Sequence, residues 1–148
     1  MRVSARTEYA LLALLELAGR KDAAPLQSRG ISAATGVPKP FHDQLLLSLR
    51  RSGLVRSVRG PGGGYVLAKA PSDITLRDAI AAVEGGSLTT QCGIKSQDGS
   101  DCRKLPVCAL LEVWKEVDSA IVRILSAKTL ADLHERQRQL DGQQMYFI

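Results

Sequence analysis

The sequence predicts a mainly α fold with a small β wing: a winged helix-turn-helix followed by a long dimerisation helix. Three patterns predict it. Two short helical segments are separated by a glycine turn, a glycine-tipped pair of short strands comes next, and a later helix carries a continuous apolar stripe. We therefore expect a winged helix-turn-helix domain over residues 1–70, and a second region over residues 71–148 that holds a cysteine loop and the dimerisation helix.

The first expected helix covers residues 5–20, with Ser4 as its N-cap and Gly19 near its end. Its apolar side chains surround nearly the whole helix, which predicts burial on more than one side. Basic residues followed by an apolar run weakly resemble a signal peptide, but Glu8 and Glu16 interrupt the run. We therefore expect a buried helix and a cytoplasmic protein without a membrane segment.

Two short helices are expected next, over residues 28–35 and 38–52. We expect Ser28 to cap the first helix and Gly36 to end it. The second helix starts with two prolines, which are tolerated only in a first turn, and Gly53 stops it. Its apolar residues recur at helical spacing and are expected to face the core: Phe41, Leu45, Leu46 and Leu49.

A β-hairpin is expected from Leu54–Arg59 and Tyr65–Leu67, because a glycine-rich turn separates these two segments. A further helix is expected over residues 75–84, with Gly85-Gly86 at its end. Thr75 and Asp78 form a capping-box-like start for it, and its apolar residues recur on one face.

A polar loop over residues 87–107 leads into a long helix over residues 107–126. Apolar residues recur along this helix at alternating spacings of four and three, which is typical of a helix–helix seam. The expected dimer-interface residues are Leu110, Trp114, Val117, Ile121 and Ile124. A short final helix is expected from Thr129 to about Gln139.

The formal charge of +5 is unevenly distributed. Residues 1–70 hold eleven lysines or arginines against four acidic residues, whereas residues 71–148 hold nine against eleven. A basic half suggests a module that binds a polyanion, and the alternative is a solvated surface that happens to be basic. The second helix of a helix-turn-helix can enter a DNA major groove, which is about 12 Å wide, so we expect double-stranded DNA as the partner.

The solvent-facing side of that second helix supplies candidate DNA contacts. Gln44 can bridge an adenine, and Lys39 or His42 can donate to a guanine. Asp43 would repel phosphate, so it acts as a filter or points away. The remaining candidates are Ser48, Arg50, Arg51, Arg56 and Arg59, of which the arginines are assigned to phosphate. For each of them the alternative is an ordinary exposed side chain.

Three cysteines, Cys92, Cys102 and Cys108, lie within 17 residues. An odd number without a secretion signal argues against a disulfide framework. Thiolates favour iron–sulfur clusters and zinc, which usually take four ligands, so Asp98, Asp101 or an exogenous ligand would complete the site. The spacing lacks the C-x-x-C pairs of zinc ribbons, and metal-free thiol oxidation is a third alternative.

Several motifs of the sequence resemble those of the IscR and NsrR type of bacterial winged-helix transcription regulators. The similarity covers residues 1–134, and its most specific segment is Ser57–Tyr65 in the hairpin. The other matching segments are Met1–Ser4, Tyr9–Ala10, Gln44–Leu46, Leu49–Val55, Ile74–Leu76, Ala82–Gly85, the three cysteines, Trp114 and Thr129–Leu133.

This resemblance implies a homodimer whose binding to a palindromic DNA operator is tuned by an iron–sulfur cluster, either 2Fe-2S or 4Fe-4S. By position, the three cysteines would be its ligands, and Glu8 would reach across the dimer as the fourth. The implied DNA contacts are Gln44 with the residues around it, and Arg59, Gly60, Gly62, Gly63 and Tyr65 in the hairpin. Two features depart from the family: nine residues separate Cys92 from Cys102, and Leu111 stands where the IscR branch has a histidine ligand.

An enzyme is the main competing class. The sequence contains no C-x-x-C motif, cofactor fingerprint or nucleophile–base pairing, so we expect no enzymatic activity. Two further classes stay open at this point: a zinc-dependent or thiol-redox regulator without a cluster, and a protein-interaction module built on a winged-helix scaffold.

Overall fold

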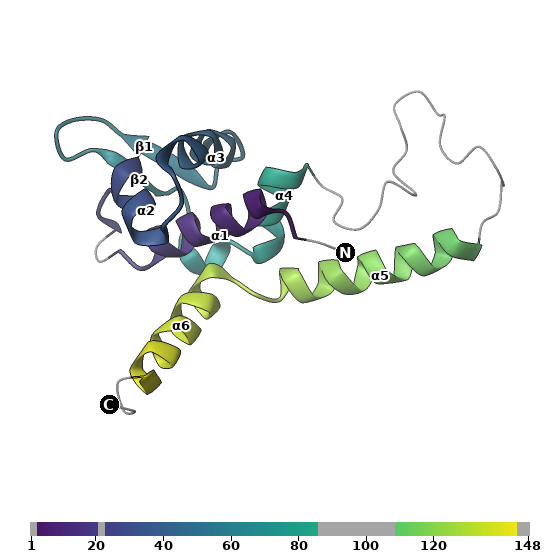
Figure 1. Cartoon of the computed structure of the whole chain (residues 1–148). Coiled ribbons are helices and arrows are strands. Elements are labelled where there is room, and N and C mark those ends of the chain that lie inside the picture. The colour runs from purple at the N-terminus through teal and green to yellow at the C-terminus, as the bar shows by residue number, and fades with distance from the viewer. Residues whose placement is uncertain (1–2, 21–22, 86–108, 145–148) are drawn as a thin grey trace, which may run out of the picture.

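The structure is a computed structural model that describes residues 3–20, 23–85 and 109–144. Within these ranges it contains the helices α1 to α6 and one antiparallel two-stranded sheet. The helices α1 to α4 and the sheet form the body, α5 extends away from it, and α6 leaves it at another angle (Figure 1). The predicted mainly α fold with a small β wing is confirmed.

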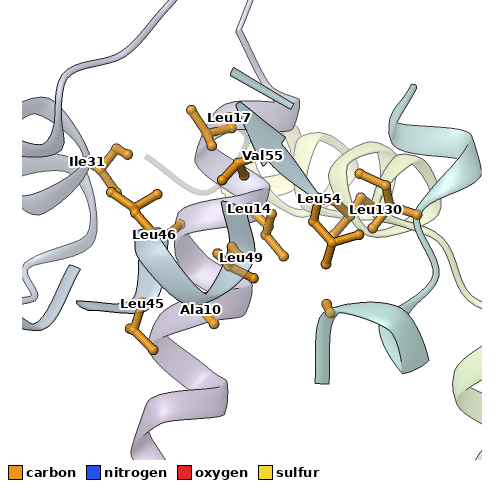
Figure 2. Close-up of a cluster of buried hydrophobic side chains, with 13 residues drawn as sticks. Ala10, Leu14, Leu17, Ile31, Leu45, Leu46, Leu49, Leu54, Val55 and Leu130 are labelled. Carbon is orange, nitrogen blue, oxygen red and sulfur yellow. The ribbon is translucent and has the colours of Figure 1, made fainter. Parts of the chain in front are cut away.

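Helix α1 (Ala5–Ala18) lies at the centre of the hydrophobic core and contacts α2, α3, α4, α6 and the wing. Its buried face meets leucines of α3 and Leu130, which begins α6 (Figure 2). Ser4 caps the helix, because its hydroxyl accepts a hydrogen bond from the Thr7 amide at 3.2 Å. The predicted helix, its N-cap and Gly19 as its end signal are confirmed, and the helix ends at Ala18 rather than at residue 20.

Helix α2 (Ser28–Thr35) has the predicted bounds, but the predicted capping role of Ser28 is wrong. The N-cap is Gln27, and no side chain bonds the first amides. Ser28 is the first helical residue, and its buried hydroxyl instead donates to Oδ1 of Asp43 at 2.6 Å. A contact between helices has therefore replaced a local cap.

Gly36 ends α2 in the left-handed conformation, with φ of 71°, and its amide donates to the Ser32 carbonyl oxygen at 3.0 Å. Helix α3 (Lys39–Arg51) starts two residues later, with Pro38 at its N-cap and Pro40 in its first turn. The predicted pair of helices with a tight glycine turn is confirmed.

The buried stripe of α3 differs from the prediction by one residue. His42, Leu45, Leu46 and Leu49 are buried, whereas Phe41 is 54% exposed. The prediction that Phe41 faces the core is therefore wrong. Positions three and four residues apart both lie on one helix face, so spacing to Leu45 fits residue 41 as well as residue 42. Packing against α1 and α2 selects residue 42.

Strands β1 (Val55–Val58) and β2 (Gly64–Leu67) pair antiparallel, with Val55 opposite Leu67 and Val58 opposite Gly64. The predicted hairpin is confirmed. The segment before α2 also pairs with it, because Leu26 and Tyr65 exchange two backbone hydrogen bonds of 3.0 and 2.9 Å. The wing is thereby attached to the helix-turn-helix by backbone as well as by side chains.

Helix α4 (Leu76–Glu84) follows a short 3-10 turn at Pro71–Asp73. Thr75 and Asp78 form the predicted capping box, with reciprocal hydrogen bonds of 3.1 Å between the side chain of each and the backbone amide of the other. Gly85 ends the helix in the left-handed conformation. Both predicted boundary signals are confirmed.

Helix α6 (Leu130–Gln144) begins with a second capping box, formed by Thr129 and Asp132. It is longer than the predicted short helix. Residues 135–141 are exposed and mostly polar, and hydrogen bonds between side chains three or four residues apart, such as Gln137 to Asp141, support this part of the helix. The start of α6 is joined to the segment before α4 by a hydrogen bond of 2.9 Å from the Leu130 amide to the Ile74 carbonyl oxygen.

Helix α5 (Ala109–Ser126) ends where the sequence predicts, and its predicted first residues lie outside the described ranges. It contacts α4 and otherwise extends beyond the body (Figure 1). No helix among the described residues combines the length and the apolar character that crossing a membrane requires.

Candidate nucleic-acid interface and cysteine segment

The outer face of α3 carries several polar and basic side chains. Lys39, Gln44, Arg50 and Arg51 are exposed, and Ser48 is half-buried. The two arginines lie in the last turn of the helix, where cations are stabilised by the helix dipole. These five predicted residues therefore lie on the accessible part of the second helix of a helix-turn-helix, which is the part that can approach base edges and phosphates.

His42 is not on this face. It is 0% exposed, and its Nε2 lies 2.7 Å from Oγ1 of Thr35, the last residue of α2. The Thr35 hydroxyl also donates to the Ile31 carbonyl oxygen at 2.9 Å, so its single proton is used there, and Nε2 of His42 is the donor to Thr35. The expectation that His42 faces solvent and contacts a base is wrong, because a buried ring cannot reach DNA.

The remaining ring nitrogen of His42, Nδ1, is buried without a hydrogen-bond partner among the described residues. Burial lowers the pKa of His42 below its ordinary value of 6.5, and the nearby Asp43 carboxylate opposes this only in part. The imidazole is therefore neutral at neutral pH. The sequence signal for this role was its spacing of three and four residues from Leu45 and Leu46.

Asp43 is half-buried, and both oxygens of its carboxylate accept hydrogen bonds. Its Oδ1 accepts from Ser28 and its Oδ2 accepts from Lys39, each at 2.6 Å. These two hydrogen bonds, that from Lys39 first, lower the pKa of Asp43. The carboxylate therefore anchors α3 to the start of α2 and offsets one positive charge of the exposed face.

The tip of the wing presents a narrower surface than predicted. Arg56, Arg59, Gly60 and Gly62 are exposed. Gly63, in contrast, is buried, and a Cβ added to it would lie 2.2 Å from the Val58 carbonyl oxygen. The prediction that Gly63 contacts DNA does not fit this position, because the residue is buried against the backbone of the turn.

Two further residues of the wing attach the wing to the rest of the protein. Tyr65 is half-buried and packs against the hydrophobic core. Gly64 has φ of 154°, and an added Cβ would lie 2.5 Å from the backbone of Leu26. Sequence reasoning did not single out Gly64, because its constraint comes from a segment that is distant along the chain.

Residues 86–108, called here the cysteine segment, lie outside the described residues, and with them Cys92, Cys102, Cys108, Asp98 and Asp101. Among the described residues no group of three His, Cys, Asp or Glu is placed to hold a metal ion. Glu8 is described: it is exposed in the first turn of α1.

The place where the chain leaves α4 for the cysteine segment is attached to that same turn of α1. Glu84 accepts hydrogen bonds from the hydroxyls of Ser4 and Thr7, the latter at 2.5 Å. These bonds, that from Ser4 first, lower the pKa of Glu84. Glu8 therefore lies on the same turn of α1 that contacts Glu84, the last residue of α4.

The apolar stripe predicted for α5 is accessible in the single chain. Leu110 is 55% exposed and Ile124 is 58% exposed, while Trp114, Val117 and Ile121 are half-buried. Soluble chains seldom leave a long apolar face uncovered.

A helix-turn-helix with an accessible basic helix, beside a glycine-tipped wing, defines the class of winged helix-turn-helix transcriptional regulators. The chain belongs to the Rrf2 family, described as iron-dependent transcriptional regulators, whose family model matches residues 3–136. The resemblance to the IscR and NsrR type of regulators is thereby confirmed.

Individual relatives agree with this family. The chain is 34% identical to the HTH-type transcriptional regulator IscR of Escherichia coli K12 over 141 residues, which cover 95% of this chain and 85% of the relative. Among solved structures it is similar to IscR of T. potens, with 33% identity, a TM-score of 0.76 and coverage of 93% and 88% of the two chains. It is also similar to CymR of B. subtilis, described as a global cysteine regulator, with 29% identity, a TM-score of 0.73 and coverage of 92% and 98%.

Proposed function

We propose that this regulator acts as a homodimer on a palindromic DNA operator, and that an iron–sulfur cluster held by the cysteine segment adjusts its affinity. In this proposal residues 1–70 read the DNA, and residues 71–148 hold the cysteine segment and pair the two copies. The observation that carries the proposal is the accessible basic face of α3 beside an exposed wing tip.

Base reading is assigned to the first half of α3, where Gln44 suits an adenine and Lys39 a guanine. Ser48 lies one turn further along the same face. Phosphate binding is assigned to the exposed arginines, which are Arg50, Arg51, Arg56 and Arg59. Gly60 and Gly62 at the wing tip let the backbone approach the DNA closely, because they have no side chain.

Homodimer formation is assigned to the apolar stripe of α5. Pairing two copies of this helix would cover Leu110 and Ile124, which no other described element covers. A two-fold dimer presents two recognition helices, and these fit half-sites about 34–36 Å apart, one turn of DNA. A palindromic operator follows from that symmetry.

The donor set fits an iron–sulfur cluster. Three thiolates within 17 residues are soft ligands of the kind such clusters take. Glu8, exposed in the first turn of α1, would supply a carboxylate from the partner copy, and Leu111 removes the histidine alternative. When bound, a cluster would supply redox chemistry and a reactive iron at the position with the weaker oxygen ligand.

The chain's own residues would carry the response to the DNA-binding region. Ser4 and Thr7 hold Glu84, so the end of α4 and the start of α1 move together. Cys108 directly precedes α5, the proposed dimer helix. A rearrangement of the cysteine segment would therefore change how two winged helices are spaced, which is a coupling between two sites through the dimer.

A second candidate is a regulator that senses through thiol chemistry without a cluster. The similarity to CymR, described as a global cysteine regulator, favours it. Oxidation of the clustered cysteines would then change the same segment without any metal.

One preparation separates these candidates. The full chain is purified without oxygen, its visible absorbance, iron and sulfide are measured, and it is used to select duplexes from a random DNA library. We expect a coloured protein with stoichiometric iron and sulfide, and an enriched palindrome whose affinity falls steeply with salt. Cys102→Ser should abolish the colour and the response of affinity to oxygen, while Ser96→Ala in the same segment should preserve both.

Three results would overturn parts of the proposal. A colourless protein that contains zinc would overturn the cluster. A metal-free protein whose DNA affinity still changes with oxidant would favour the thiol candidate. Failure to enrich any duplex, whatever the state of the cysteines, would overturn the DNA-binding proposal itself.

A further inference from the structure

Phe41 is an exposed aromatic residue at the start of the recognition helix. It lies in the first turn of α3 and is 54% exposed, although a phenylalanine gains by burial. Gln44 lies three residues further on, so the two side chains share one helix face. Figure 1 shows α3 and the wing on one side of the body, whereas α5 extends from another side.

The ring of Phe41 is held in place. Its centroid lies 6.3 Å from that of Tyr9 in α1, with the two ring planes at 71°, which is an edge-to-face contact. Tyr9 is half-buried and packs against the core. The exposed ring is therefore supported from behind by the body of the protein and presents its free face outward.

We propose that Phe41 reads a thymine in the operator by contact with its 5-methyl group. Residues in the first turns of a recognition helix are the ones that reach base edges. In the major groove thymine is the base that offers a methyl group, and an apolar side chain is its complement. Phe41 would thus recognise a methyl group by apolar contact, beside the hydrogen bonds that Gln44 would make to an adenine. This inference rests on the proposed DNA-binding function.

The size of the effect follows from the area of one methyl group. Removing a buried CH₂-sized group from an apolar contact weakens an interaction about fourfold. In a palindromic operator both copies of the contact would be lost, which gives about fifteenfold in total when the two half-sites contribute independently.

The test uses deoxyuridine, which differs from thymidine only by lacking the methyl group. The full chain first selects an operator from a random duplex library, and each thymine of the selected half-site is then replaced by deoxyuridine in both halves. We expect one position at which the replacement weakens binding about fifteenfold for the unmodified protein. For Phe41→Ala we expect the same replacement to have no effect.

Leu140→Ala is the matched control, because Leu140 is 40% exposed on α6, away from the recognition helix, and its loss should leave the methyl effect intact. Thermal melting verifies that Phe41→Ala is folded.

If no thymine shows a methyl effect, or if Phe41→Ala retains it, the inference is overturned. If Phe41→Ala instead weakens the dimer and keeps the methyl effect, Phe41 belongs to a protein interface. Absence of any enriched duplex would overturn the DNA-binding proposal, and this inference with it.

Discussion

Nε2 of His42 lies 2.7 Å from Oγ1 of Thr35, and the neighbouring Asp43 accepts a hydrogen bond of 2.6 Å from Ser28. Thr35 is the last residue of α2 and Ser28 is its first. Two adjacent side chains of α3 therefore hold both ends of α2. Since the first helix of a helix-turn-helix sets the angle at which the second enters the groove, these contacts orient the recognition helix.

His42 should make the stability of the protein depend on pH. Folding lowers its pKa below 6.5, so the unfolded chain binds a proton more readily once the pH falls to that value. The His42 contribution to stability is therefore fully present above pH 6.5 and is lost progressively as the pH falls toward the folded-state pKa. Thermal melts between pH 7.5 and 5 would measure this, in a window above the ordinary pKa of carboxylates.

The control for that measurement is His42→Leu. Leucine suits the buried position and removes the orphan Nδ1, and the Thr35 hydroxyl keeps its bond to the Ile31 carbonyl oxygen. We expect its stability at pH 7.5 to lie within about 1 kcal/mol of the parent protein. An unchanged loss of stability between pH 7.5 and 5 in this variant would show that other groups cause it.

Asp43→Asn should strengthen binding to DNA of any sequence. Asparagine can still accept from Ser28, but it no longer offsets the charge of Lys39 and no longer repels phosphate. Stability should change by less than about 1 kcal/mol, because the Lys39–Asp43 pair is solvent-exposed. Binding to a random-sequence duplex, measured against salt concentration, should become tighter and steeper; equal or weaker binding would contradict the role assigned to this carboxylate.

Gly63→Ala should damage the wing, whereas Gly62→Ala should not. A Cβ at Gly63 would lie 2.2 Å from the Val58 carbonyl oxygen and 2.9 Å from that of Gly60, while nothing lies within 4 Å of a Cβ at Gly62. We expect Gly63→Ala to lower the free energy of unfolding by about 2 kcal/mol or more. Chemical denaturation of both variants checks this, and comparable stabilities would show that the tip can rearrange.

Arg59→Ala should reduce the salt dependence of operator binding. Each phosphate contact contributes about 0.9 to the slope of log affinity against log salt, so the proposed homodimer, which would lose one contact per copy, should lose about two units of that slope. Arg136→Ala is the control, because Arg136 is exposed on α6 and bonds only to Gln139 among the contacts described for it. A slope that Arg59→Ala leaves unchanged would place this arginine away from the phosphates.

Local chemistry made much of the fold predictable. Glycines and capping residues act within a few positions of their own place in the chain, so Gly36, Gly85 and the Thr75–Asp78 capping box marked helix ends correctly. The wing was predictable for the same reason, because its turn and both strands lie within one short stretch.

The errors arose where tertiary contacts decide. The choice between Phe41 and His42 for the buried stripe depends on how α3 is rotated against α1 and α2, and helical spacing alone allows both. Ser28 has the chemistry of a cap, but a partner on α3 binds its hydroxyl. The pairing of Leu26 with Tyr65 joins segments that lie far apart in the sequence, so no local pattern indicates it.

The junction between the segment before α4 and the start of α6 has a consequence for the chain between them. The Leu76 amide donates to the Lys128 carbonyl oxygen at 2.8 Å, and the Leu130 amide donates to that of Ile74 at 2.9 Å. The chain between Leu76 and Lys128 therefore starts and ends at one pair of backbone hydrogen bonds. Doubling the length of a closed loop costs only about 0.6 kcal/mol. Extra residues between these hydrogen-bonded ends, such as those in the long spacing from Cys92 to Cys102, should therefore change the free energy of unfolding of the winged helix-turn-helix only slightly.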